Sequence, residues 1–328
     1  MYGNMAMTYS IAVRTLGTGG VVFRKELCSI AVQTIPPERV LIYIAEGYPR
    51  PEWTVGKEEY RWVTKGMMAQ RILPYDEIES DCILMLDDDV CLAPDSAERM
   101  LRALEENGAD CVGADVFRNQ DMPLRRKLYA AVTNLVFPHW DGKCAFRLHA
   151  NGSFSYNARP VKDFYWSQTC GGPAALWRKE AFLRLHLEDE LWLDRFPFAY
   201  NEDTLSSYKL YRNGGRLGVL YRSGIENLDA RTASEGFRKS AERVFYRTKA
   251  SFMVWWRICF RNGADTAATR FRAAGAFGIK CLWLSLIMAA ASLLMRDAVV
   301  FSSYFRGLRE GWKAVHGPSY RALPPYVK

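Results

Sequence analysis

Along the first third of the chain, apolar residues alternate between two spacings. Continuous apolar runs within residues 10–17, 39–47 and 81–89 predict buried strands. Segments 21–34 and 93–108 instead repeat an apolar residue every three or four positions, which predicts amphipathic helices. Strands and helices that alternate in this way predict an α/β fold, in which a mostly parallel sheet carries helices on both faces.

Helix-capping and helix-breaking residues refine these boundaries. Pro36 and Pro37 end the first helix, while Asp95 is the expected N-cap of the second and Gly108 its stop. Shorter segments continue the pattern, with the following assignments: a strand at 60–66, a helix at 67–80 interrupted by Pro74, a strand at 109–117, irregular structure at 118–165, renewed order at 170–185, a helix at 202–215 and a last strand at 216–224.

Beyond about residue 230 the pattern is helical only. We therefore predict an α/β domain at residues 8–230 and a helical region at 231–328. Charge follows the same division, because 17 Lys/Arg against 5 Asp/Glu give the second region +12, whereas the first 230 residues carry −4. A basic region of this kind predicts an anionic partner, either nucleic acid or an anionic lipid surface.

Residues 273–295 form a long apolar segment with one charge, Lys280. Its 23 residues would just span a bilayer, so the segment could span the membrane, lie in or re-enter its surface, or pack on the protein. The flanks are basic and aromatic, which favours a helix on the inner-membrane surface. An apolar run among the basic residues argues against nucleic acid as the partner.

The cysteines and the N-terminus bear on the compartment. None of the eight cysteines forms a CxxC pair, so no zinc site is predicted, and their mostly apolar neighbours predict reduced core thiols of a cytosolic protein. No basic segment followed by an apolar run opens the chain, so no secretory signal is expected.

Three consecutive aspartates, Asp87, Asp88 and Asp89, follow the apolar residues 83–86. Burying three carboxylates at a strand end is costly unless a cation binds them, and strand ends of α/β sheets are where ligands bind. Alternation along the strand would direct Asp87 and Asp89 to one side and Asp88 to the other. Such a pair suits Mg²⁺ or Mn²⁺ shared with substrate phosphates; the alternative is a solvated turn that caps the next helix.

Two further motifs carry candidate chemistry. Glu202 and Asp203 open a helix, where they either stabilise its N-terminus or include a general base. The adjacent carboxylate and partial burial would raise the pKa of Asp203. Gly171 and Gly172 either allow close approach of a ligand to the backbone or form a tight turn.

Taken in chain order, these segments resemble the family 2 inverting glycosyltransferases, which have the GT-A fold. The resemblance covers about residues 10–236 and rests on these segments: CSIAVQTIPPERVLIYIAEG, KGMMAQR, LDDDV, GGPAALWRKEAF and EDTLSSYKLYRNGG. The C-terminal segment YFRGLREGWKAV is similar to tails of bacterial members that build surface polysaccharides.

The resemblance implies a role for each matching residue. Asp89 would be the main metal ligand, Asp87 would contact the metal or the nucleotide ribose, and Asp203 would be the catalytic base beside Glu202. The positions implied on the nucleotide side are Thr15, Glu46, Lys65, Gly66, Arg71 and Asp88. Those implied on the acceptor side are Gly171, Gly172 and Trp177.

The chain departs from the family pattern at two places. Glu46 stands where an aspartate usually holds the base, which leaves the nucleotide open among UDP, GDP and dTDP. A histidine that many relatives use near the metal or diphosphate is absent, and Asn227, Asp229 or Arg231 could take its place. The four histidines of the chain, His139, His149, His186 and His316, match no motif.

The resulting prediction is a metal-dependent inverting glycosyltransferase using Mn²⁺ or Mg²⁺. It would move a sugar from a nucleotide-diphosphate donor to a hydroxyl of a lipid-linked or polysaccharide acceptor, from the cytoplasmic face of the inner membrane. The alternatives are a non-catalytic glycan- or lipid-binding protein on the same scaffold, and a nucleotidyltransferase, for which "LGTGG" at residues 16–20 is a weak phosphate-binding loop.

Overall fold

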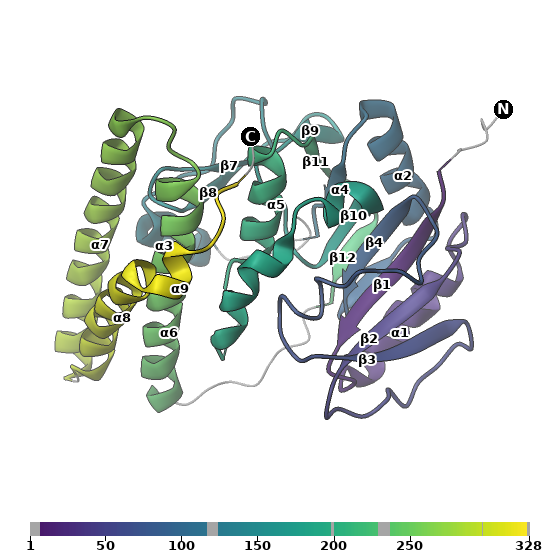
Figure 1. Cartoon of the computed structure of the whole chain (residues 1–328), viewed down its shortest axis with the longest axis horizontal. Helices are drawn as coiled ribbons and strands as arrows, with labels where there is room; N and C mark the ends of the chain where they lie inside the picture. The colour runs from purple at the N-terminus through teal and green to yellow at the C-terminus, as the bar shows by residue number, and fades with distance from the viewer. Residues whose placement is uncertain (1–6, 117–123, 198–199, 229–236, 297, 327–328) are drawn as a thin grey trace.

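The computed structural model describes residues 7–116, 124–197, 200–228, 237–296 and 298–326 (Figure 1). The chain has a mixed α/β architecture, in which the C-terminal helices stand beside a central sheet. This confirms the predicted fold class.

Eight strands form the central sheet in the order β3-β2-β1-β4-β10-β6-β11-β9. Their bounds are β1 Tyr9–Thr15, β2 Val40–Ala45, β3 Glu58–Val63, β4 Cys82–Asp87, β6 Cys111–Ala114, β9 Phe164–Trp166, β10 Ala174–Arg178 and β11 Leu217–Leu220. The first four strands along the chain pair in parallel, as do β6 and β11, while β10 and β9 run antiparallel to their neighbours. The sheet is therefore mostly parallel, with two reversed strands.

Strand β1 is the point at which the order of the sheet reverses. It pairs with β2 on one side and β4 on the other, so that Arg14 lies opposite both Tyr43 and Asp87. Ligands of open α/β sheets bind in the crevice outside the strand ends at such a point. The fold thus brings the end of β1 beside the aspartates that follow β4.

Alternate residues of the strands belong to two hydrophobic layers. On one face, Ile11, Ile42 and Leu84 pack with α1 (Gly20–Ala31) and α2 (Ser96–Asn107). On the other face, Ala12, Leu41 and Ile83 belong to a cluster that includes α4 (Lys179–Leu183), η1 (Leu187–Arg195) and α5 (Glu202–Arg212). This period of two is what a sheet covered on both faces requires.

The C-terminal region adds helices to the second layer. They are α6 (Phe237–Trp255), the π-helix η2 (Trp256–Arg261), α7 (Ala267–Met295), α8 (Val299–His316) and α9 (Pro318–Arg321). Phe252, Trp255 and Tyr320 share one hydrophobic cluster with Phe182 and Trp177 of the sheet domain. The boundary predicted near residue 230 lies outside the described residues.

The helix predicted at residues 67–80 is wrong, whereas Asp95 takes the predicted N-cap position without the expected side-chain hydrogen bond. Residues 67–80 form turns rather than a helix, because Asp194 binds the N–H groups of Met68 and Ala69 and Pro74 prevents continuation. Asp95 occupies the N-cap position of α2 but its carboxylate binds Arg99 instead of the helix N-terminus.

The region expected to be irregular contains ordered elements. These are α3 (Leu124–Asn134) and the hairpin strands β7 (Phe146–Leu148) and β8 (Phe154–Tyr156), followed by β9. All eight cysteines have free thiols, and Cys28 is exposed rather than in the core. The strands β7, β8 and β9 were not predicted from the sequence because three residues are too few to show the alternation of apolar and polar positions.

Candidate functional site

The three aspartates lie at the turn between β4 and the short strand β5 (Val90–Leu92). Strand β4 ends at Asp87, and Asp88 and Asp89 belong to the turn itself. The alternation of side chains expected from a continuous strand therefore stops at Asp87. Each carboxylate has different partners, drawn from different parts of the chain.

Asp87 is bound by two arginines. Its Oδ1 lies 2.6 Å from Nε of Arg14 and 3.3 Å from Nη2 of Arg71. Burial alone would disfavour the charged carboxylate, but the two guanidinium groups outweigh it and hold the pKa of Asp87 below its usual value. Asp87 thus favours its ionised form and orients both arginines.

Asp88 points toward the end of β1. The hydroxyl of Thr15 donates to its Oδ2 at 2.5 Å, and the N–H of Gly17 donates to the same hydroxyl at 2.8 Å. Burial raises the pKa of Asp88 and the charge of Asp87 adds to the shift, against the hydrogen bond from Thr15. The predicted nucleotide-side residues Thr15 and Asp88 are therefore in direct contact.

Asp89 faces the strand that follows β11. Its carbonyl oxygen accepts from the N–H of Leu228 at 2.7 Å, and its Oδ1 is 3.5 Å from Nδ2 of Asn227. Pairing of β5 with β12 (Ile225–Asn227) creates this proximity. Asn227 is thus brought beside the aspartate turn, whereas Asp229 and Arg231 lie outside the described residues.

The chemistry of this turn suits a divalent ion that is completed by a substrate. Within the described parts of the chain, no three His, Cys, Asp or Glu side chains are grouped closely enough to hold a metal by themselves. Mg²⁺ and related ions are often held by one or two carboxylates together with phosphate oxygens and water. The sequence predicts Asp89 and Asp87 for this role, but Asp87 is already paired with Arg14 and Arg71, so the carboxylates of Asp88 and Asp89 fit that arrangement better.

Helix α5 brings a second pair of carboxylates to the same site. Asn201 precedes it with a left-handed backbone (φ 58°), a conformation that asparagine tolerates better than most residues. Glu202 then lies 3.4 Å from Nη2 of Arg14. Arg14 therefore bridges Asp87 and Glu202, which joins the aspartate turn to α5.

Asp203 has an environment suited to proton transfer. Burial raises its pKa to about 6, with a further contribution from the charge of Glu202. The N–H of Thr204, at 2.6 Å from Oδ1, and the two site arginines oppose the shift. The upward shift expected from the sequence is thus found.

The loop containing Gly171 and Gly172 packs against this carboxylate. A Cβ atom at Gly172 would lie 3.1 Å from Cβ of Asp203 and 3.4 Å from Nη2 of Arg71, so a side chain there would crowd both. The carbonyl of Gly172 also accepts from Nη2 of Arg71 at 3.2 Å. Arg71 therefore connects the glycine loop with Asp87.

Ser207 fastens the same loop to α5. Its hydroxyl donates to the carbonyl of Asp203 at 2.6 Å, which uses its one proton. It must then accept from the hydroxyl of Thr169 at 2.8 Å and from the N–H of Cys170 at 3.3 Å. A buried serine thus sets the distance between Asp203 and the glycine loop.

The remaining nucleotide-side residues lie at the same edge of the sheet. Glu46 follows β2 and is exposed, and exposed Lys65 follows β3, with Nζ 2.8 Å from the hydroxyl of Tyr48. Gly66 has no room for a side chain, because a Cβ atom there would lie 2.3 Å from Oδ2 of Asp194.

Trp177 is not brought to the site. It is 4% exposed, lies within β10 opposite Ile83, and packs edge-on against Phe182 with ring centroids 5.3 Å apart. Its position in the core explains its apolar sequence context. The structure gives it a packing role, separate from the glycine loop at the end of its strand.

Sequence reasoning missed Arg14 and Ser207. A detectable signal existed for Arg14, since a charge within a buried strand requires a partner of opposite charge. Ser207 offered no such signal, because serine is common in amphipathic helices and its contacts come from a loop far away in sequence.

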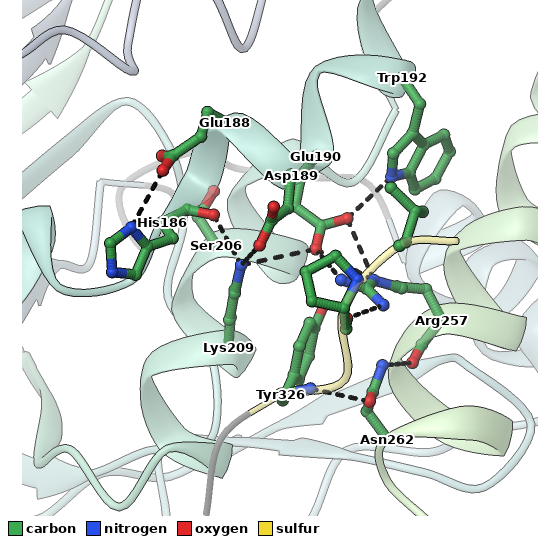
Figure 2. Close-up of polar contacts among 12 residues, drawn as sticks. His186, Glu188, Asp189, Glu190, Trp192, Ser206, Lys209, Arg257, Asn262 and Tyr326 are labelled. Carbon is green, nitrogen blue, oxygen red and sulfur yellow. Dashed lines mark hydrogen bonds and ion pairs between the residues drawn. The ribbon is translucent and has the colours of Figure 1, made fainter. Parts of the chain in front are cut away.

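An ionic group, here called the Glu190 cluster (Asp189, Glu190, Lys209 and Arg257), connects α5 with η1 and η2 (Figure 2). Glu190 Oε1 lies 2.6 Å from Nη2 of Arg257, and both side chains are fully buried. Lys209 of α5 places Nζ 3.7 Å from Glu190 and 3.2 Å from Asp189. Arg257 also donates to the carbonyl of Pro324 at 2.7 Å, which ties the C-terminus to the cluster.

Comparison with known proteins gives one family match and similar solved structures. Residues 62–185 match the model of the family described as Glycosyl transferase family 2. This segment includes the aspartate turn and the glycine loop but ends before Glu202 and Asp203. No curated protein sequence matches the chain.

Solved structures extend the comparison to the fold. A crystal structure of GalNAc-T7 with UDP, GalNAc and Mn²⁺ superposes with a TM-score of 0.51 at 10% identity, over 89% of this chain. The chain spans 59% of the length of that structure. The likeness shows a GT-A-like fold, as the sequence resemblance implied.

Proposed function

We propose that the protein is a metal-dependent, inverting family 2 glycosyltransferase. It transfers a sugar from a UDP-, GDP- or dTDP-linked donor to a hydroxyl of a lipid-linked or polysaccharide acceptor. The observation that carries the proposal is the bridge through Arg14, which joins the aspartate turn to the Glu202–Asp203 pair. The family match over residues 62–185, and the UDP and Mn²⁺ in the structural neighbour, support the donor and ion classes.

The residues of the turn would serve the donor. Asp89 would hold Mn²⁺ or Mg²⁺ together with Asp88, and Thr15 would contact the nucleotide. The bound ion would neutralise charge that develops on the diphosphate leaving group. Asp87, already paired with two arginines, keeps Arg14 and Arg71 directed toward the site.

Asp203 would act on the acceptor. One displacement at the anomeric carbon inverts its configuration and requires one base, which removes the proton from the attacking hydroxyl. A pKa near 6 leaves the carboxylate ionised at neutral pH yet basic enough to take that proton. The glycine loop beside it would leave space for the acceptor backbone or ring.

A pair of alanine variants tests this division of labour. Asp89→Ala should abolish Mn²⁺-dependent donor binding, measured as thermal stabilisation by a panel of nucleotide sugars. Asp203→Ala should retain that binding but lose transfer by about 10² to 10⁴-fold. Asp163→Ala is the matched control, because that carboxylate is 63% exposed and pairs with Arg222.

Near-normal transfer by Asp203→Ala would exclude it as the base. Donor binding by the native protein without turnover on any donor would instead favour a non-catalytic glycan-binding role.

A further inference from the structure

The geometry points to a membrane-docking face made by α3 and α7 together, which we infer lies on an anionic phospholipid surface. Helix α3 comes from the sheet domain and α7 from the C-terminal region, so the face is assembled from segments far apart in sequence. Figure 1 shows α7 at the edge of the molecule, on the side away from β1 and β4. The inference is independent of transfer activity, because lipid binding is measured without donor or acceptor.

The outward side of α7 is apolar along its length. Its exposed large side chains recur mostly at helical spacing: Phe271, Ile279, Leu282, Leu286, Leu293 and Leu294, with exposed fractions from 56% to 87%. Within the described residues, α7 alone is long and apolar enough to cross a membrane, and only 6% of its most apolar window is buried. A stripe of this kind requires an apolar partner.

The inward side of α7 is bound to the protein. Phe277 stacks on Trp255 with ring centroids 3.9 Å apart, and Ala273 is buried. Lys280, the one charge within residues 273–295, turns toward the protein and places Nζ 2.7 Å from Oγ of Ser153. A helix that packs on the protein along one side and exposes apolar side chains along the other is suited to lie in the membrane plane.

Helix α3 extends the same face. The indole N–H of Trp283 on α7 donates to the carbonyl of Val132 on α3 at 2.8 Å. The Ser153 hydroxyl contacts the carbonyl of Asn134 at 3.1 Å, which links the end of α3 to the Lys280 junction. The large apolar side chains exposed on α3 and just after it are Leu128, Tyr129, Val132, Leu135, Phe137 and Trp140. Tyrosine and tryptophan are typical of the membrane–water interface.

Charges around this face match anionic headgroups. Exposed arginines lie on α3 (Arg125), in the first turns of α7 (Arg270 and Arg272) and at its C-cap (Arg296). The sequences of both helices contain no Asp or Glu. Two copies of this face would repel each other, whereas phosphatidylglycerol would attract it. The charge pattern therefore favours lipid over a second copy of the chain.

Vesicle flotation of the full chain tests the inference. The protein should float with vesicles of phosphatidylcholine and phosphatidylglycerol, and far less with phosphatidylcholine alone or at high salt. Leu282→Asp/Leu286→Asp on α7 and Tyr129→Asp/Val132→Asp on α3 should each weaken binding about tenfold or more. Val32→Asp is the matched control, since Val32 is 60% exposed at the end of α1.

Alkaline carbonate should release the native protein from the vesicles, since α7 lies in the membrane plane. Native protein that stays in solution, or an α3 variant that binds like native protein, would overturn the composite face. Resistance to carbonate would show that α7 spans the bilayer instead. A dimer that dissociates when α7 is substituted, with no vesicle binding, would assign the face to a second copy. Cooperative thermal unfolding verifies that each variant is folded. If the α7 variant does not fold, vesicle binding of the α3 variant alone tests the proposed face.

Discussion

At the residue scale, two carboxylates of the site show how environment divides one residue type into two roles. Asp87 stays ionised because Arg14 and Arg71 outweigh the effect of burial on its pKa. Among the described residues no cation pairs directly with Asp203, so burial and Glu202 raise its pKa to about 6. The first carboxylate favours its charged form, and the second can exchange a proton near neutral pH.

The pKa of Asp203 predicts the acidic limb of the activity profile. The base must be ionised to accept a proton, so kcat should rise with pH through about 6 and level off above it. Glu202→Gln removes a neighbouring negative charge, and the limb should then move to lower pH. The measurement is kcat against pH with saturating donor and acceptor. A limb that keeps its position in Glu202→Gln would mean that another group limits the reaction.

Glu26 of α1 predicts a pH-dependent loss of stability. It is fully buried, and among the described residues its carboxyl group has no close hydrogen-bond partner; the backbone N–H of Val90 opposes the rise of its pKa less than burial and the neighbouring charges favour it. Burial, and then the charges of the three aspartates, raise its pKa well above the ordinary value of 4.5. The unfolded chain releases this proton above pH 4.5 while the folded chain keeps it, so stability falls as pH rises.

Glu26→Met should therefore raise the free energy of unfolding by about 1–3 kcal/mol at mildly alkaline pH, and less at acidic pH. Urea unfolding at several pH values measures the effect. Glu26→Gln is the control that removes ionisation but keeps a polar group, so it should flatten the pH dependence without the full gain. An unchanged pH dependence in both variants would exclude Glu26 as its source.

At the scale of elements, α5 carries catalytic candidates at one end and structural contacts along its length. Glu202 and Asp203 occupy its first turn, Ser207 binds the glycine loop, and Lys209 enters the Glu190 cluster. Contacts with the glycine loop and with the Glu190 cluster therefore fix the position of α5, and with it the position of Asp203. Its placement depends on residues outside the segment that matches the family model.

Ser207→Ala should separate the glycine loop from Asp203. The variant loses the acceptor for Thr169 and Cys170, so we expect kcat to fall by about tenfold with donor KM little changed, and stability to drop by about 1–2 kcal/mol. Ser206→Ala is the neighbouring control, because that hydroxyl donates to Glu202 O within the helix. Steady-state kinetics measure kcat and donor KM separately. An equal fall of kcat in both variants would contradict a positioning role for Ser207.

At the scale of the whole molecule, the Glu190 cluster joins the C-terminal region to the sheet domain. Arg257 belongs to the π-helix η2, contacts Glu190 of η1 and binds the carbonyl of Pro324 near the C-terminus (Figure 2). The side of α7 opposite the proposed docking face shares a hydrophobic cluster with α5, through Phe277 and Leu205. The proposed membrane attachment and the position of α5 would therefore be coupled through one continuous packed unit.

Removing one partner of the buried ion pair should be costly. Arg257→Met leaves Glu190 as a buried carboxylate without its main cation, so the free energy of unfolding should fall by about 3–5 kcal/mol. Arg257→Met/Glu190→Gln should recover much of that loss, since the uncompensated charge is gone. Urea unfolding measures all variants. A double variant as unstable as the single one would show that packing, and not charge, determines the effect.

Local patterns in the sequence determined most of the fold class and the candidate chemistry. The strands before Thr15 and Asp87, helices α1, α2 and α5, and the Gly108 stop follow from periodicity and capping among neighbouring residues. The same neighbours placed three aspartates at a strand end, where a ligand is expected. Each of these features depends on a few consecutive residues, so the sequence alone was sufficient to predict them.

Tertiary structure alone decided which distant residues meet. It brought Arg14 between Asp87 and Glu202, moved Trp177 into the core, and laid α3 against α7. It also ended the strand at Asp87, so that the three aspartates face three different partners. Strand order and helix packing set these contacts, and both arise from burial of the whole chain rather than from any local pattern.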